Sequence, residues 1–182
     1  MIKQLLHYIR VCYHLARPHE KLQDVVWRNL KKYHIGENLH SGFFENEKFI
    51  ESEFKITDDH KARFYYGVYK DIFYCRCKII QDYDPELSTE IFVMAAHFNN
   101  LLRVGKVRID PTERTVDYVL DSSLVEFVIY PGEIPQTTIT HYRTTKDVYW
   151  AFQKLIQERE EPAIIIADLL RLKEESNNKQ DS

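Results

Sequence analysis

The sequence is poor in glycine, and this shortage excludes the common nucleotide-binding loops. Its 182 residues include only five glycines, and each of them stands alone. Neither a P-loop nor a G-x-G-x-x-G turn can therefore form, and the G-x-S-x-G elbow of α/β-hydrolases is missing as well. We predict no catalytic residue and no cofactor, and we keep a small-molecule sensor or an enzyme as the alternative.

Cysteine is equally scarce. The three cysteines, Cys12, Cys75 and Cys77, cannot all pair, so we expect no disulfide framework and predict a reducing, cytoplasmic location. Cys75 and Cys77 would share one face of a strand and could hold a soft metal. Structural zinc needs about four ligands, usually from two cysteine pairs, and the sequence has no second pair. Core packing is therefore the favoured interpretation of both thiols, and no metal site is predicted.

The eight histidines lack the spacing of a metal site. His7 and His14 would lie two helical turns apart, which is too far for joint ligation of one ion. His97 could act as a base for Cys75 or Cys77, but a catalytic thiol needs an exposed, electropositive setting that the sequence does not indicate. His97 remains the centre of the alternative hypothesis, a ligand pocket beside the middle helix.

The chain also lacks a basic excess and a long apolar run. Twenty-five Lys and Arg residues offset 28 Asp and Glu residues, giving a net charge of −3. Nucleic-acid-binding domains are usually basic, so single-stranded nucleic acid is the least favoured partner. No apolar run approaches the ~20 residues that span a bilayer, so no membrane partner is expected. Lys3, His7 and Arg10 within residues 1–17 predict an extra amphipathic N-terminal helix rather than a secretory signal.

Hydrophobic spacing is what the sequence does contain. Apolar residues at three- and four-residue steps predict helices over residues 2–16, 18–36, 88–102 and 144–161, and a short last helix from Pro162. Residues 176–182 are polar and predict a disordered tail.

Alternating apolar and polar residues predict three strands, over 49–56, 63–69 and 72–79. The two-residue turn at 70–71 fixes the register of the last two strands. It gives these cross-strand pairs: Val68–Phe73, Tyr66–Cys75 and Phe64–Cys77. All six side chains fall on one face, and a slip of one residue would reverse the pattern.

The second half of the chain is harder to assign. Residues 106–110 and 115–120 predict a strand pair, 124–130 predict one more strand, and 133–144 fit no pattern except a short edge strand at 137–142. The predicted order is α-α-β-β-β-α-β-β-(β)-α-α, a single α+β domain over residues 1–175. Its antiparallel β-meander sheet would have helices packed on one face.

The segment FNNLLRVGKVRID, from Phe98 to Asp110, carries a family resemblance. Together with the preceding meander it resembles the YbjN family of bacterial sensory transduction regulators over residues 18–156. The motif positions would be Asn99 or Asn100, Gly105 and Asp110. The resemblance implies a fold like that of type III secretion chaperones and a non-enzymatic, chaperone-like or regulatory function. The extra helix at 1–17 and the stretch 124–142 depart from the family pattern.

The outward face of the predicted meander combines aromatic and basic side chains, the types that anchor interfaces. Its candidate partner-binding residues are Tyr65, Tyr69, Tyr74 and Arg76. We expect a protein partner, with a homodimer favoured. A solvated face, cover by the N-terminal helices and stacking of nucleic-acid bases are the alternatives, and Glu51 and Glu53 argue against a phosphate-binding tract.

Overall fold

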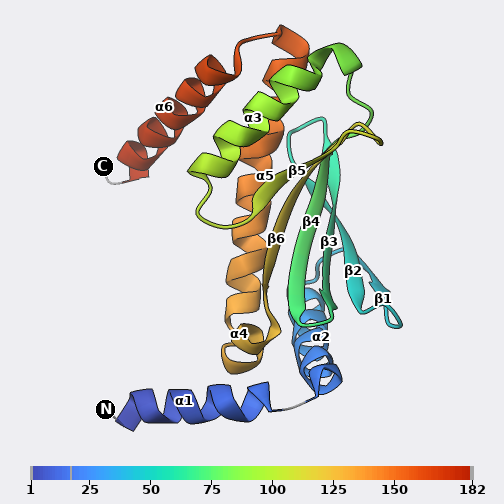
Figure 1. Ribbon diagram of the computed structural model, residues 1–182, viewed down its shortest axis with the longest axis vertical. Helices are drawn as coiled ribbons and strands as arrows, with labels where there is room; N and C mark the ends of the chain where they lie inside the picture. Colours follow the sequence, from blue (N-terminus) through green and yellow to red (C-terminus); the bar gives the residue numbers. More distant parts are fainter. Residues whose placement is uncertain (1, 17, 181–182) are drawn as a thin grey trace.

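The computed structural model describes residues 2–16 and 18–180 and shows an α+β fold, with helices on one face of a six-stranded antiparallel sheet (Figure 1). The helices are α1 (Ile2–Leu15), α2 (His19–Gly36), the 3-10 turn η1 (Pro85–Leu87), α3 (Ser88–Leu101), α4 (Leu124–Ile129), α5 (Glu133–Glu158) and α6 (Pro162–Gln180). The strands are β1 (Ser41–Phe44), β2 (Phe49–Lys55), β3 (Lys61–Tyr69), β4 (Ile72–Ile80), β5 (Lys106–Asp110) and β6 (Thr115–Ser123).

The strand order is β1-β2-β3-β4-β6-β5, and every neighbouring pair is antiparallel. The predicted register of the β3–β4 hairpin is confirmed, because Phe64 pairs with Cys77, Tyr66 with Cys75 and Val68 with Phe73. All six side chains are buried, as the alternation of the sequence requires. The predicted α+β class and the meander are therefore correct.

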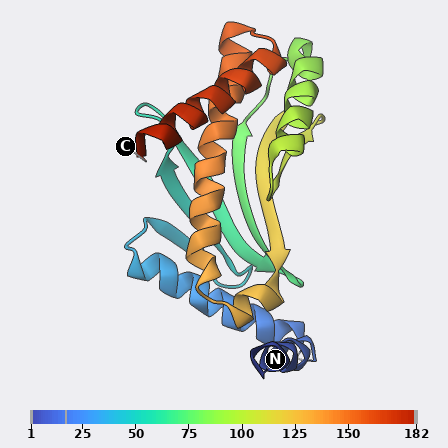
Figure 2. The ribbon, with the colours of Figure 1, turned by 90° about the vertical axis from the view of Figure 1, so that its left-hand side faces the viewer.

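Helix α5 runs along the covered face of the sheet, and α2 and α3 lie at its two ends (Figure 2). The buried side chains of α5 recur at three- and four-residue steps and include Val148, Phe152 and Leu155. Helix α6 packs against α3 and α5 rather than against the sheet. Because α2, α3 and α5 lie on the same face, the opposite face of the sheet has no helical layer among the described residues.

The predicted strand at 124–130 is wrong, because these residues form α4. Leu124 and Phe127 are both buried, which is helical spacing, and the Ser123 hydroxyl accepts a hydrogen bond from the amide of Val125 at 3.3 Å. A short apolar run does not distinguish a buried helix from a strand by periodicity alone. Tertiary packing decides here, since the Phe127 ring lies 4.5 Å from that of Phe73.

The edge strand considered at 137–142 is also wrong. Helix α5 begins at Glu133 and is 26 residues long. Thr138 and Thr145 are buried in it, and each hydroxyl donates to the carbonyl four residues earlier. β-branched threonines lower helix propensity, so local sequence understates this helix and packing against the sheet stabilises it.

Two further differences concern the ends of elements. Residues 41–44 form β1, a strand that the pattern of the sequence did not predict. The predicted disordered tail at 176–182 is helical as far as Gln180, since α6 extends to that residue, and 181–182 lie outside the described residues. Within the described part of the chain, no helix has both the length and the apolar character needed to cross a membrane.

Candidate functional site

The candidate site is the face of the sheet that no helix covers, which we call the open face (Figure 1). Its residues alternate with the buried ones, so the register of the strands fixes which side chains are neighbours. One cross-strand row follows the order Phe44–Phe49–Gly67–Tyr74 over strands β1 to β4. The Phe44 and Phe49 rings stack with centroids 4.2 Å apart, and Tyr65 lies 6.3 Å beyond Phe49. The aromatic row consists of four rings, one from each of strands β1 to β4: Phe44, Phe49, Tyr65 and Tyr74.

Gly67 explains how Tyr74 fits into this row. A Cβ atom at position 67 would lie 2.7 Å from the Tyr74 hydroxyl and 2.8 Å from the Cβ of Phe49. The missing side chain therefore lets the Tyr74 ring lie flat over β3. Burial raises the pKa of the Tyr74 hydroxyl, although the charge of Arg76 opposes this effect. Tyr74 is thus a neutral, half-buried platform rather than a freely projecting side chain.

Charged residues flank the aromatic row and largely pair with one another. The Arg76 guanidinium donates to Asp117 Oδ2 at 2.7 Å, and Asp117 is buried beneath it. Lys78 of β4 and Arg108 of β5 are the cross-strand neighbours of Asp117. Asp117 Oδ1 has no hydrogen-bond partner among the described residues. This arrangement holds Arg76 in a fixed position beside Tyr65, its partner across the β3–β4 ladder.

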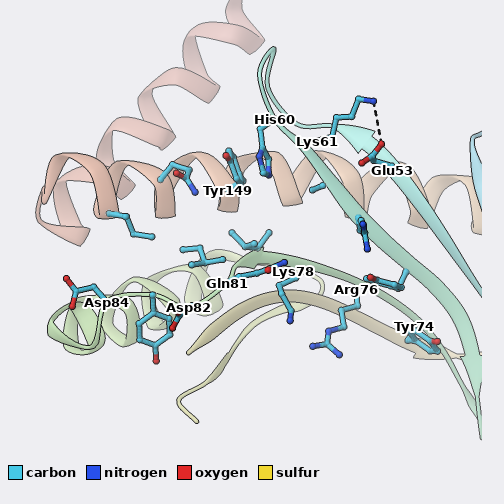
Figure 3. Close-up of a pocket in the computed structure, with 18 of the residues that line it drawn as sticks. Glu53, His60, Lys61, Tyr74, Arg76, Lys78, Gln81, Asp82, Asp84 and Tyr149 are labelled. Atoms are coloured by element: carbon cyan, nitrogen blue, oxygen red, sulfur yellow. Dashed lines mark hydrogen bonds and ion pairs between the residues drawn. The ribbon is translucent and has the colours of Figure 1, made fainter. Parts of the chain in front are cut away.

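A hollow of about 1120 Å³ opens where β3 and β4 separate (Figure 3). The ladder between the two strands ends at Phe64 and Cys77, although β3 begins at Lys61 and β4 continues to Ile80. Beyond that point each strand pairs only with its outer neighbour. Side chains of α5, including Tyr149 and Gln153, form the floor of this fork. Backbone groups facing each other across the fork therefore lack partners in the β3–β4 ladder.

The rim of the fork is polar. The His60 ring stacks on Tyr149 with centroids 4.7 Å apart, and Lys61 pairs with Glu53 at 3.4 Å. In Figure 3 Lys78 projects from β4 on the other side of the hollow. At the far end, hydrogen bonds from the Glu86 amide and from Arg159 lower the pKa of Asp84. The fork thus combines exposed charges with unpaired strand edges.

A second hollow of about 880 Å³ lies at the other end of the open face. Phe49, Tyr74 and Arg76 line both hollows, so the two hollows adjoin at the aromatic row. Tyr69 lines only the second hollow, where its exposed ring lies 5.3 Å from the Lys70 ammonium. The structure therefore brings Tyr65, Tyr74 and Arg76 together and places Tyr69 at the edge of the same face.

The predicted core position of Cys75 and Cys77 is confirmed. Both thiols are fully buried on the covered face, opposite Tyr66 and Phe64. Burial raises the pKa of both thiols, so they stay protonated and unreactive in the folded protein. Among the described residues, no group of three or more His, Cys, Asp or Glu side chains could hold a metal ion.

The motif residues of the family resemblance have structural positions at the end of α3 and around β5. The Asn99 amide donates to the carbonyl of Val107 at 3.0 Å and accepts from its N–H at 2.7 Å. Gly105 has φ +74°, and a Cβ there would lie 2.6 Å from the Tyr118 hydroxyl. Asp110 accepts hydrogen bonds from the amides of Thr112 and Glu113 in the β5–β6 turn. These residues build the β5 edge, and none of them lines either hollow.

His97 lies half-buried on α3 and lines neither hollow of the open face. Cys75 and Cys77 are buried on strand β4, and the Cys77 thiol donates to the carbonyl of Lys78 rather than to His97. The nucleophile-and-base pair considered for these residues therefore has no support in the geometry.

Sequence reasoning missed Phe44, Phe49 and Gly67. Phe44 and Phe49 flank the four polar residues 45–48, a spacing typical of a hairpin loop, and this pattern could have revealed β1. Gly67 stands directly opposite Tyr74 in the register that the sequence already predicted. A glycine inside a strand often marks a close approach, so its position was a usable indication.

The comparisons with known proteins returned neither a matching family model nor a matching curated protein for this chain.

Proposed function

We propose that this chain is a non-enzymatic protein-interaction module that associates with a second copy of itself through the open face. The observation that carries the proposal is the aromatic row, four rings that cross four strands of an uncovered sheet. Rigid aromatic side chains beside a fixed Arg are the usual anchors of protein interfaces. The same proposal includes a chaperone-like or regulatory function, which the YbjN resemblance implies, and a cytoplasmic location, which the scarcity of cysteine predicts.

The charge pattern favours a protein partner over nucleic acid. Glu51 pairs with Arg63, Glu53 with Lys61 and Asp117 with Arg76, so acidic groups already neutralise most of the cations. A phosphate backbone would need these cations free, because it binds through unpaired Lys and Arg side chains. Paired charges around apolar rings instead match the polar rim and apolar centre of a protein interface.

The two edges of the sheet differ in their capacity to accept another strand. Asn99 occupies the outer edge of β5 by bonding both backbone groups of Val107. Strand β1 is the other outer strand, and its Phe43 and Phe44 are exposed. A second copy could therefore extend the sheet at β1 while its side chains cover the aromatic row.

The test is a double variant, Tyr65→Ala with Tyr74→Ala, measured by sedimentation equilibrium. Loss of two aromatic anchors should weaken self-association at least tenfold, because such residues commonly contribute 2 kcal/mol or more, roughly, to an interface. Circular dichroism should show an unchanged fold, since both rings lie outside the core.

Phe92→Ala is the matched control, because Phe92 is an exposed aromatic residue on α3, away from the open face. It should leave the dissociation constant of the dimer unchanged. A wild-type chain that stays monomeric at high concentration, or a double variant that dimerises like the wild type, would contradict the proposal.

A further inference from the structure

Helix α1 exposes its apolar side chains to an unusual degree. Five large side chains of this 14-residue helix are more than half exposed: Leu5 61%, Leu6 54%, Tyr8 66%, Ile9 56% and Tyr13 57%. Ile9 follows Leu5 by four residues and Leu6 by three, so the three side chains lie on one side of the helix and form a continuous apolar stripe. A stripe of this kind normally faces a protein core, and here it faces away from the sheet.

The contacts of α1 with the rest of the chain explain this orientation. His7 Nδ1 lies 2.8 Å from the hydroxyl of Tyr130, and the two rings stack with centroids 6.0 Å apart. Val11, one turn further along, is half-buried, and the principal neighbour of α1 is α4. His7 and Val11 lie on the side of the helix opposite Ile9. The side that contains His7 therefore holds α1 against the body, and the apolar stripe is left outside.

The charge of this part of the chain has one sign. Residues 1–19 include Lys3, Arg10 and Arg17 and no Asp or Glu, while the whole chain has a net charge of −3. The negative balance therefore lies entirely in the remainder of the protein. An amphipathic helix that combines an apolar stripe, tyrosines and cations without acidic residues is the type that lies in a membrane interface.

We propose that α1 binds the surface of an anionic lipid bilayer, with the Leu5, Leu6 and Ile9 stripe inserted at the level of the acyl-chain boundary. Burial of the stripe supplies the apolar contribution, and each Lys or Arg near an anionic surface strengthens binding about fivefold. A second α1 is a poorer occupant of the stripe, because it would bring cations of the same sign to the contact.

The place of α1 in the fold permits this arrangement. Figure 1 shows α1 at one end of the molecule, with α3 and α6 at the other, and Figure 2 shows it beyond the end of the sheet. A bilayer against α1 would therefore leave the open face accessible. No membrane partner was expected because the chain has no apolar run long enough to span a bilayer, and the described residues form no spanning helix. A helix that lies on the membrane surface does not need that length, so α1 can still bind a bilayer.

Co-sedimentation of the full chain with lipid vesicles tests the proposal. One set of vesicles contains phosphatidylglycerol and phosphatidylcholine in equal parts, and the other contains phosphatidylcholine alone. We expect the wild-type chain to bind the anionic vesicles at least tenfold more tightly and to lose this preference in high salt. Leu6→Ser with Ile9→Ser should reduce binding at least tenfold, and Arg10→Gln about fivefold.

Leu170→Ser with Leu172→Ser is the matched control, because both leucines are similarly exposed on α6, a helix distant from α1. It should bind vesicles like the wild type. Failure of the wild type to bind anionic vesicles, equal binding to both vesicle types, or a Leu6/Ile9 variant that binds unchanged would each overturn the proposal.

Sedimentation equilibrium of the same Leu6/Ile9 variant separates lipid from a second copy as the occupant of the stripe. The proposal predicts an unchanged association state without lipid. A loss of dimer in this variant would instead assign the stripe to a protein contact and overturn the lipid assignment. The result is independent of the open-face proposal, whose test changes Tyr65 and Tyr74 and uses no lipid.

Discussion

Asn99 shows how one side chain closes an exposed strand edge. Its amide presents one donor and one acceptor to Val107, which is the hydrogen-bonding pattern of a neighbouring strand. Edge strands with free backbone groups invite pairing with other chains, so this closure directs association away from β5. The sequence offered Asn99 or Asn100 as the motif position, and only the fold distinguishes between them.

Replacing Asn99 with Ala should lower the free energy of unfolding by about 1–3 kcal/mol, because the amide and carbonyl of Val107 lose their partner. Chemical denaturation measures the change. Asn100→Ala is the control, because Asn99 and Asn100 are both exposed on α3 and the bonds to Val107 come from Asn99, so this variant should lose no more than about 0.5 kcal/mol. Equal losses in the two variants would show that the bonds to Val107 contribute nothing specific.

At the scale of elements, the β3–β4 hairpin separates two functions by strand alternation. One face places Phe73, Cys75 and Cys77 in the core, and the other presents Tyr74 and Arg76 to the hollows. A side-chain period of two makes these assignments interdependent. The position of the thiols is therefore a direct measure of the orientation of Tyr74 and Arg76.

Thiol labelling of the native chain should modify Cys12 rapidly and leave Cys75 and Cys77 unmodified. Cys12 is exposed, whereas the other two are buried and burial raises the pKa of both thiols. Mass spectrometry counts the labels before and after unfolding in denaturant, which should expose all three thiols. A Cys12→Ser variant that still labels rapidly in the native state would show that the predicted register is wrong.

At the scale of the whole molecule, two buried histidines link the helical layer to the sheet. The rings of His34 of α2 and His141 of α5 both lie near the ring of Tyr66, with centroids 5.5 Å and 5.8 Å from it. His34 Nδ1 lies 2.9 Å from the Ser41 hydroxyl, and His141 Nε2 donates to the carbonyl of Tyr118 at 3.3 Å. Burial lowers the pKa of each histidine to about 4, so both are neutral in the folded protein at neutral pH.

Acid should therefore destabilise the fold. An unfolded histidine takes up a proton near pH 6.5, whereas the folded ones do so only near pH 4, so the unfolded state binds more protons between these values. Stability should fall as pH decreases through this window, by about 2 kcal/mol for each histidine between about pH 7 and pH 5. Denaturant titrations at the two pH values measure the loss.

His141→Gln provides the comparison for this prediction, because glutamine keeps a polar side chain and does not titrate. The variant should be less stable at neutral pH, and its stability should depend less on pH by about 2 kcal/mol over the same interval. Carboxylates titrate in wild type and variant alike, so the difference between them isolates the histidine. An unchanged pH dependence would show that His141 titrates normally.

The sequence alone determined the elements whose pattern is strong and local. The alternation in 63–69 and 72–79, with a two-residue turn between them, allows only one register that buries all the apolar residues, so the hairpin and its two faces followed directly. The core position of both thiols and the outward position of Tyr65, Tyr74 and Arg76 followed from the same register.

Only the tertiary structure decided the rest. The spacing of the apolar residues at 124–129 fits a strand and a helix equally well. The segment is a helix because Phe127 then packs against Phe73. The threonines in α5 disfavour a helix locally, and burial against the sheet outweighs that preference. The aromatic row and the outward stripe of α1 depend on which surfaces the helices leave uncovered. Local sequence does not contain that information, because it arises from contacts between residues far apart in the chain.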